Sequence, residues 1–160
     1  MTDLKKIYVN VFNAIKSDDE LLMLLEIDKD GVEINDFLKK CRSQIIDSPT
    51  PDDLLNNYDT RICIYEEQSN RVESVDVGYI RMDIHITQDK DKIDRKKLKI
   101  AKRLIEVLDS KERKRAGKKP LPVGLFGLSF RYRVSGTSTN YTGWDKYSLV
   151  FEYQHIANLY

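Results

Sequence analysis

The chain has few residues of the types that bind metals or form disulfides. Two histidines and two cysteines occur among its 160 residues. Cys41 and Cys63 do not form a Cys-x-x-Cys pair, and neither His85 nor His155 has further ligand-type residues at zinc-site spacing. We therefore expect no metal site and no cofactor. Both cysteines are interpreted as buried free thiols, because an unpaired cysteine behaves as a small hydrophobic residue.

Long apolar runs are also missing. No stretch of about eighteen apolar residues occurs, which is the length that a membrane-spanning helix requires. The lysines near the N-terminus are not followed by an apolar segment of the signal-peptide type. The sequence thus predicts no membrane partner and a protein that stays in the cytoplasm of the cell that makes it.

Neither sign of charge is in excess. Lys and Arg together number 27 and Asp and Glu 26, which gives a formal net charge of +1. A charge this close to zero provides no overall field that would attract nucleic acid or an acidic membrane. Any site for an acidic partner must therefore be local.

The motifs of common enzyme classes are absent. There is no Gly-x-Ser-x-Gly elbow, phosphate-binding glycine loop or dinucleotide fingerprint, and Asp76 and Asp83 lack the Glu-x-Lys partner of a nuclease core. Residues 26–31 resemble the start of a calcium-binding loop, but Phe37 stands where the closing glutamate is required. We interpret this segment as an acidic turn between helices. No catalytic residue is predicted, and the chain is not expected to be an enzyme.

The composition is that of a globular protein with a well-solvated surface. Hydrophobic residues make up 41% of the chain and charged residues 33%. We predict a single α+β domain over residues 1–160. Apolar residues at helical spacing predict helices over 4–15 and 34–46, and the Ser17 and Glu20 capping box predicts a short helix over 18–25. Residues 27–57 are interpreted as a candidate helical insertion, with one more helical turn starting at Thr50.

Strands are indicated where the period of apolar residues changes to two. This pattern predicts strands over 60–66 and 79–87, with a polar loop over 68–75 between them. In the second strand Ile80, Met82, Ile84 and Ile86 are expected to face a core. The alternate residues, Tyr79, Arg81, Asp83, His85 and Thr87, are expected to face outward.

The last third of the chain predicts one long helix and two strands. Asp91 is expected to cap a helix over 92–115, and strands are expected over 125–134 and 146–156. The first of these strands should place Phe126, Leu128, Phe130, Tyr132 and Val134 on one face, opposite Arg131 and Arg133. The order of elements predicts a mainly antiparallel four-stranded sheet covered on one face by helices.

One local cluster of positive charge follows the predicted long helix. Its members are Lys111, Arg113, Lys114, Arg115, Lys118 and Lys119. Cations at a helix C-terminus complement the helix dipole, so a solvated helix end is one interpretation. The other is contact with phosphates or with an acidic neighbouring subunit.

The segment 135–145 is the second candidate site. It is predicted to be an exposed hairpin loop, and it holds Tyr141 and the single tryptophan, Trp144. A tryptophan beside a strand can cover the rim of the core. Alternatively, Tyr141 and Trp144 form a partner-contact loop, because aromatic residues are enriched at the centres of interfaces.

In its arrangement of elements, the second half of the chain resembles the tail terminator proteins of tailed bacteriophages and related phage-like particles. The resemblance rests on the predicted strands at 61–65 and 78–86, the helix at 93–108, and the closing strands at 126–132 and 147–153. It implies a hexameric ring of identical subunits in the tail or neck of a virion. Such a ring caps the tail tube, ends tube elongation and joins the head-tail connector protein, with no chemical step.

The resemblance also suggests partners for the basic cluster. In a ring, residues 111–119 would contact an acidic neighbouring subunit or the genomic DNA that passes through the lumen, without sequence specificity. Two alternatives stay open for the whole chain. It could be another neck, head-completion or tail-assembly protein, or a nucleic-acid-binding regulator that uses the 111–119 cluster.

Overall fold

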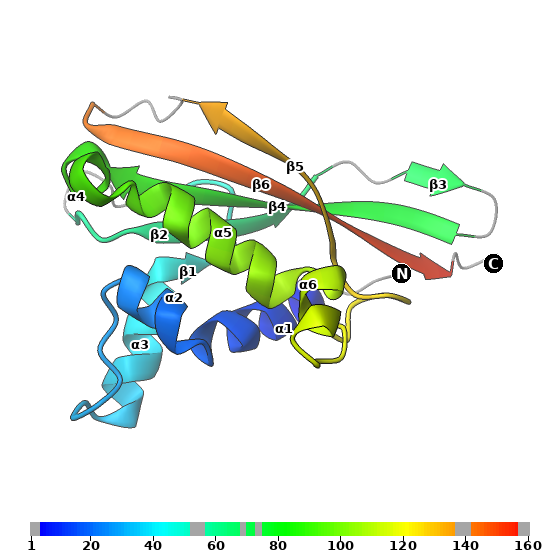
Figure 1. Ribbon diagram of the computed structural model, residues 1–160, viewed down its shortest axis with the longest axis horizontal. Helices are drawn as coiled ribbons and strands as arrows, with labels where there is room; N and C mark the ends of the chain where they lie inside the picture. Colours follow the sequence, from blue (N-terminus) through cyan, green and yellow to red (C-terminus); the bar gives the residue numbers. More distant parts are fainter. Residues whose placement is uncertain (1–3, 52–56, 68–69, 73–74, 137–141, 157–160) are drawn as a thin grey trace.

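The helices and strands follow one another in blocks along the chain: three helices, four strands, three helices and two strands among the described residues. A computed structural model describes residues 4–51, 57–67, 70–72, 75–136 and 142–156. The elements, in chain order, are α1 (Leu4–Lys16), α2 (Asp19–Leu24), α3 (Ile34–Gln44), β1 (Ile45–Ile46), β2 (Arg61–Glu66), β3 (Asn70–Val72), β4 (Val75–Thr87), α4 (Gln88–Asp94), α5 (Lys96–Leu108), α6 (Ser110–Arg115), β5 (Ser129–Gly136) and β6 (Trp144–Ile156) (Figure 1).

The strands form one mainly antiparallel sheet. Its order is β1-β2-β4-β6-β5, and β3 pairs with the start of β4. Only β1 and β2 run parallel. The predicted α+β class is confirmed, and the four predicted strands correspond to β2, β4, β5 and β6. The predicted count was too low, because β1 falls inside the expected third helix and β3 inside the expected loop over 68–75.

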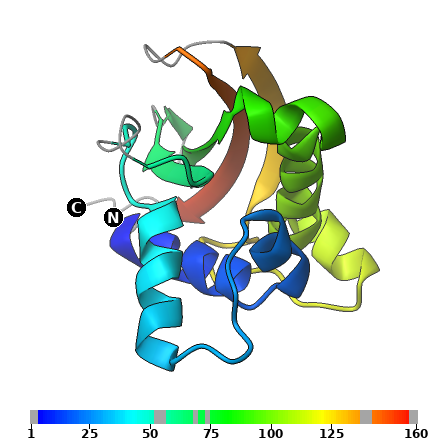
Figure 2. The ribbon, with the colours of Figure 1, turned by 90° about the vertical axis from the view of Figure 1, so that its left-hand side faces the viewer.

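The helices lie on one face of the sheet, as the order of elements predicts (Figures 1 and 2). Buried side chains from both layers belong to one continuous cluster. Into it α1 contributes Ile7, Val11 and Ile15, α5 contributes Ile100, Leu104 and Leu108, and the sheet contributes Ile80, Met82, Ile84, Leu149 and Phe151. These residues alternate in β4 and β6, so the period-two pattern of the sequence sets which face receives the helices. No helix in the described part of the chain is long and apolar enough to cross a bilayer.

Helix α2 is fixed at its N-terminus by Asp18. The Asp18 carboxylate accepts a hydrogen bond from the Leu21 amide at 3.0 Å, so the cap is Asp18 and the prediction of Ser17 was wrong. The Ser17 hydroxyl instead donates to the Asn13 carbonyl, one turn back in α1. Arg103 of α5 donates to both Asp18 oxygens, at 3.0 and 2.6 Å. This bidentate pair joins α2 to α5.

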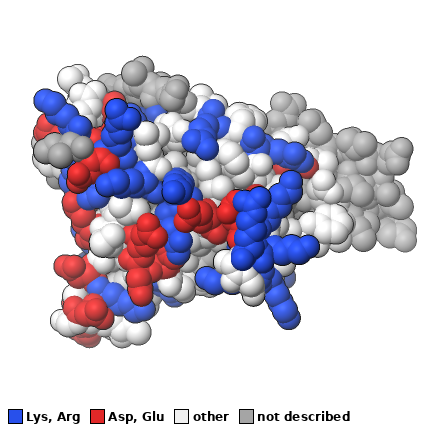
Figure 3. Space-filling view, in the orientation of Figure 1, with Lys and Arg blue, Asp and Glu red and all other residues white. Residues whose placement is uncertain are grey.

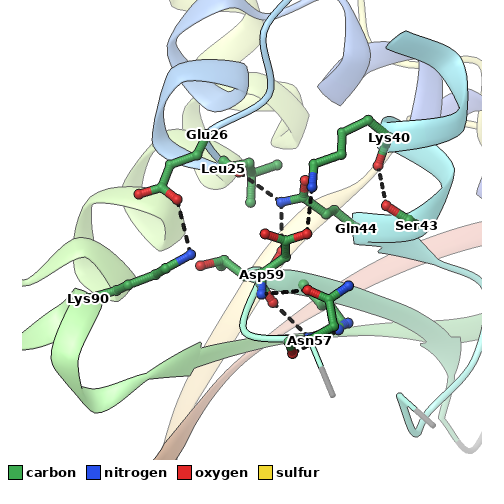
Figure 4. Close-up of polar contacts among 10 residues, drawn as sticks. Leu25, Glu26, Lys40, Ser43, Gln44, Asn57, Asp59 and Lys90 are labelled. Atoms are coloured by element: carbon green, nitrogen blue, oxygen red, sulfur yellow. Dashed lines mark hydrogen bonds and ion pairs between the residues drawn. The ribbon is translucent and has the colours of Figure 1, made fainter. Parts of the chain in front are cut away.

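Helix α3 is tied to the sheet through its C-terminal end. It ends at Gln44, before the predicted limit of 46, because Ile45 and Ile46 pair in parallel with β2. The buried Gln44 amide donates to the carbonyls of Leu25 and Thr60, at 2.7 and 2.9 Å (Figure 4). Phe37 and Cys41 enter the core. Whether residues 27–57 are an insertion stays a prediction, and the helical turn expected from Thr50 falls largely on residues 52–56, outside the described residues.

The long helix predicted over 92–115 is in fact three helices. Arg95 adopts a left-handed conformation (φ 49°) that separates α4 from α5, and Asp109 is extended between α5 and α6. The Asp109 carboxylate, 7% exposed, accepts hydrogen bonds from the amides of Glu112 and Phe130, at 3.1 and 2.8 Å. The break at Asp109 thus provides the cap of α6 and joins that helix to β5.

An irregularity in β5 changes which side chains face the helices. The register with β6 shifts between Phe130 and Tyr132, as in a β-bulge. Phe130 therefore packs against the core, whereas Tyr132 and Val134 lie on the face of the sheet opposite the helices and are 50% and 40% exposed. The prediction that all three share one buried face was wrong beyond Phe130.

The face of the sheet opposite the helices is more buried than predicted. Asp83, His85 and Thr87 were expected to face outward, yet each is at most 9% exposed. Asp83 accepts hydrogen bonds from Tyr65, Arg81 and Ser148, so its charge is compensated. Burial, together with the hydrogen bond to Asp83, raises the pKa of Tyr65. Both cysteines are buried, as predicted.

The burial of His85 can be tested by measuring the stability of the protein as a function of pH. Both of its ring nitrogens are buried without a hydrogen-bond partner, and its pKa is lowered from 6.5 to about 4, chiefly by burial. Within this shift, the positive charges of Lys146 and Arg61 also lower the pKa, while Asp83 opposes them. The unfolded chain therefore takes up the proton first as pH falls, so stability present above pH 6.5 is lost between about 6.5 and 4.

We predict that His85→Leu flattens this part of the stability profile. Urea unfolding from pH 7.5 to 4 should show wild type losing up to about 3 kcal/mol more than the variant, as the pKa shift implies. Carboxylates such as Asp18 contribute equally to both proteins, so the difference isolates His85. Parallel profiles would contradict the prediction.

A second prediction concerns Asp109, whose carboxylate accepts two hydrogen bonds. Asp109→Ala removes the α6 cap and the bond to β5, and we expect about 2–3 kcal/mol of destabilisation in urea unfolding. Asp109→Asn keeps one carbonyl acceptor and should cost roughly half as much. Asp94→Ala, an exposed site in α4, is the control. Equal stability of Asp109→Ala and the control would show that these hydrogen bonds contribute nothing.

Candidate assembly surfaces

Helix α6 presents the basic cluster at one end of the helical layer. Asp109 caps the helix, and Gly117 (φ 73°) lets the chain reverse after it, so that the Lys118 amide donates to the Arg113 carbonyl at 2.8 Å. Glycine favours this left-handed position at helix ends because it has no side chain to clash. The six predicted cations are therefore brought together on α6 and the turn that follows it.

The six cations do not serve one purpose. Arg113 donates to the carbonyls of Val107 and Lys119, at 2.9 and 2.7 Å, and so ties the turn to α5. Arg115 pairs with Glu112 at 2.8 Å. The other four side chains are exposed and form no hydrogen bond or ion pair with the described residues: Lys111, Lys114, Lys118 and Lys119. Two of the six cations, Arg113 and Arg115, thus have partners within the chain, and the four lysines are available to a binding partner.

An exposed aromatic side chain lies beside these lysines. Phe126 is 65% exposed, which corrects its predicted place on the buried face of a strand, since β5 begins only at Ser129. The Ser110 hydroxyl at the start of α6 donates to the Phe126 carbonyl at 2.6 Å. Gly127 allows this approach, because a Cβ there would lie 2.7 Å from the Ser110 oxygen. We call Phe126 with Lys111, Lys114, Lys118 and Lys119 the basic surface.

The sequence contains a pattern typical of a loop here, which the prediction of a strand over 125–134 did not take into account. Residues 120–127 contain two prolines and two glycines, at Pro120, Pro122, Gly124 and Gly127. Such spacing is typical of turns and interrupts a strand.

A surface of opposite charge lies at the other end of the helical layer, over the turn between α2 and α3 (Figure 3). An open depression of about 720 Å³ there has the buried side chains of Leu22 and Ile27 at its floor and Met23, which is 68% exposed, at its edge. Asp19, Asp28 and Asp30 line its rim together with Lys29, and Glu33 follows in the same turn. We call this depression and its carboxylates the acidic groove. The prediction of an acidic turn at 26–31 agrees with its position.

One carboxylate beside the acidic groove already has partners within the chain. Glu26 pairs with Lys90 and Lys96, at 3.0 and 2.9 Å, and these hydrogen bonds lower the pKa of its carboxyl group. Within the described part of the chain, Asp28, Asp30 and Glu33 are exposed and make no ion pair. Lys29 offsets one of these charges, so the groove keeps a net negative charge around an apolar floor.

Trp144 lies apart from both surfaces. It begins β6, two residues earlier than predicted, and is 4% exposed, with the Arg61 guanidinium 5.6 Å from the centre of a ring. This burial favours the interpretation that Trp144 covers the rim of the core rather than anchoring a partner. Tyr141, the other residue of the predicted partner-contact loop, lies outside the described residues.

Metal-binding arrangements were sought over the same residues. The described ranges contain no group of three or more His, Cys, Asp and Glu side chains that could hold an ion. His155 in β6 stacks on Tyr153, with 5.9 Å between the ring centres.

Comparison with known proteins shows a likeness in fold to a virion component. No protein-family model matches the chain, and no curated protein matches its sequence. Among solved structures, a chain in the virion of a native gene transfer agent particle is similar in fold, with a TM-score of 0.56. The alignment covers 94% of this chain and 94% of that chain, at 11% sequence identity. The two chains therefore share a fold over nearly their full described length.

Proposed function

We propose that the chain is a structural protein of a phage-like virion, and more specifically a tail terminator. In this role it forms a hexameric ring that caps the tail tube, ends tube elongation and offers a surface to the head-tail connector protein. The proposal contains no chemical step, cofactor or membrane. The protein is made in the cytoplasm of a host bacterium and ends in the tail or neck of the particle.

The observation that carries the proposal is the likeness in fold to a chain of the gene transfer agent virion. It spans 94% of both chains, so it covers the whole arrangement of helices and sheet rather than one common motif. Similarity of fold alone does not fix function. The resemblance of residues 60–160 and of the first helix to tail terminators is a second line of support, and it favours the terminator position among the roles in the particle.

The shape of the protein is compatible with ring assembly. Two edges of the sheet, at β1 and β5, are unpaired within the described residues. Exposed edges favour association with another chain. A closed ring of identical subunits is a common way to satisfy such surfaces without open-ended growth.

We predict that the purified protein forms six-fold rings visible by negative-stain electron microscopy. Added to tube subunits during assembly, it should shorten the mean tube length as its concentration rises, because each bound ring ends one tube. Bovine serum albumin at equal mass is the control. Rings that leave the distribution of tube lengths unchanged would exclude the terminator role and favour another neck or head-completion protein. A protein that stays monomeric and joins only a preformed partner would exclude the terminator role in the same way.

The four exposed lysines of the basic surface support a second candidate function, a nucleic-acid-binding regulator. Phosphate contacts weaken steeply with salt, because binding releases counterions. Fluorescence anisotropy with duplex DNA at 50 and 200 mM salt would detect such binding. Affinity in the micromolar range or tighter at 200 mM salt, without rings, would favour the regulator over the terminator.

A further inference from the structure

The basic surface and the acidic groove are opposite in charge, and each has an apolar component. On the basic surface, the exposed Phe126 follows a loop that is hydrogen-bonded to Ser110, next to Lys111 at the start of α6. On the other, a depression with Leu22 and Ile27 at its floor is lined by aspartates together with Lys29. Interfaces that are stable in water combine an apolar centre with a polar rim of matching charge.

Each surface exposes an apolar side chain that a contact between them would cover. Phe126 and Met23 are 65% and 68% exposed. A phenylalanine that enters the depression beside Met23 would remove both side chains from water, which is favourable. The charges around them would exclude a partner of the same sign.

The two surfaces cannot meet within one chain. They lie at opposite ends of the helical layer, with α6 at one end and the α2–α3 turn at the other (Figures 1 and 3). Contact between them must therefore join two copies. Since the two surfaces differ, the contact is head-to-tail, the type that produces a ring when its rotation closes and a filament when it does not.

We propose that the basic surface of one copy binds the acidic groove of the next, with Phe126 inserted over Leu22 and Ile27 between the lysine and aspartate rims. This inference rests on the proposed ring and identifies the surfaces that hold it together. It assigns the 111–119 cluster to an acidic neighbouring subunit and not to passing DNA.

Paired charge reversals test the contact. One variant carries Asp28→Lys, Asp30→Lys and Glu33→Lys, so that both of its surfaces are basic. A second carries Lys111→Glu, Lys114→Glu and Lys119→Glu, so that both are acidic. By analytical ultracentrifugation, each alone should self-associate at least about tenfold more weakly than wild type, because like charges then meet. Mixed in equal amounts they should assemble again, as alternating copies in a ring of even number.

A matched control separates this effect from a general change of charge. Lys99→Glu with Lys102→Glu reverses two exposed lysines of α5 that lie in neither surface, and it should assemble as wild type does. For the apolar contact, Phe126→Ser should weaken assembly, whereas Tyr58→Ser, at an equally exposed site, should not. Circular dichroism and thermal unfolding confirm that each variant is folded.

The outcomes distinguish this inference from the proposed function. If wild type forms rings and neither reversal weakens them, the contact is wrong while the ring stands. Should the lysine reversal abolish DNA binding and leave assembly intact, the basic surface serves nucleic acid and the inference falls. Rescue by mixing, combined with tube lengths that do not respond to the ring, would support the contact and exclude the terminator role. A wild-type protein that stays monomeric at millimolar concentration would overturn both.

Discussion

The antiparallel ladder between β4 and β6 is the constraint on which the other elements depend. Each strand has 13 residues, and their pairing runs without interruption from Val75 and Ile156 to Thr87 and Trp144. This register places Met82 and Leu149 toward the helices and Asp83 and Ser148 toward the opposite face. A slip of one residue would reverse both faces and bury the Asp83 carboxylate in the apolar core. The remaining strands and the helical layer are positioned by this pair.

The sequence predicted the elements whose pattern is local. Alternation in β4 and helical spacing in α1 come from the side chains of the element itself, so both elements were found. The limits of α1 were nearly correct, whereas β4 ends at Thr87 as predicted but begins at Val75, four residues before the predicted start. The failures occur where a single residue responds to distant partners. Asp109 interrupts a helix-forming segment because its carboxylate can reach the Phe130 amide. His85 is buried although it alternates with apolar residues, because the face opposite the helices is itself largely enclosed, which local alternation does not reveal.

In the candidate surfaces, too, the sequence predicted the features that depend on local pattern and missed those that depend on distant contacts. The lysines of the basic surface were predicted, since a run of charge is visible in any window of the sequence. That Arg113 is used internally and that Phe126 is exposed depends on how residues 116–128 return to α5 and α6, which charge and periodicity do not specify. The acidic groove was seen only as a turn. Its apolar floor comes from the packing of α2 against α5, and so its shape appears only in three dimensions.

The two hydrogen bonds of Asp109 also have a mechanical consequence. One carboxylate holds the first turn of α6 and the start of the edge strand β5, and Ser110 fastens the Phe126 loop to the same point. These hydrogen bonds couple the three segments at one corner of the molecule. A force that a neighbouring molecule places on the edge strand would therefore be transmitted to the lysine-bearing helix through two adjacent side chains, Asp109 and Ser110.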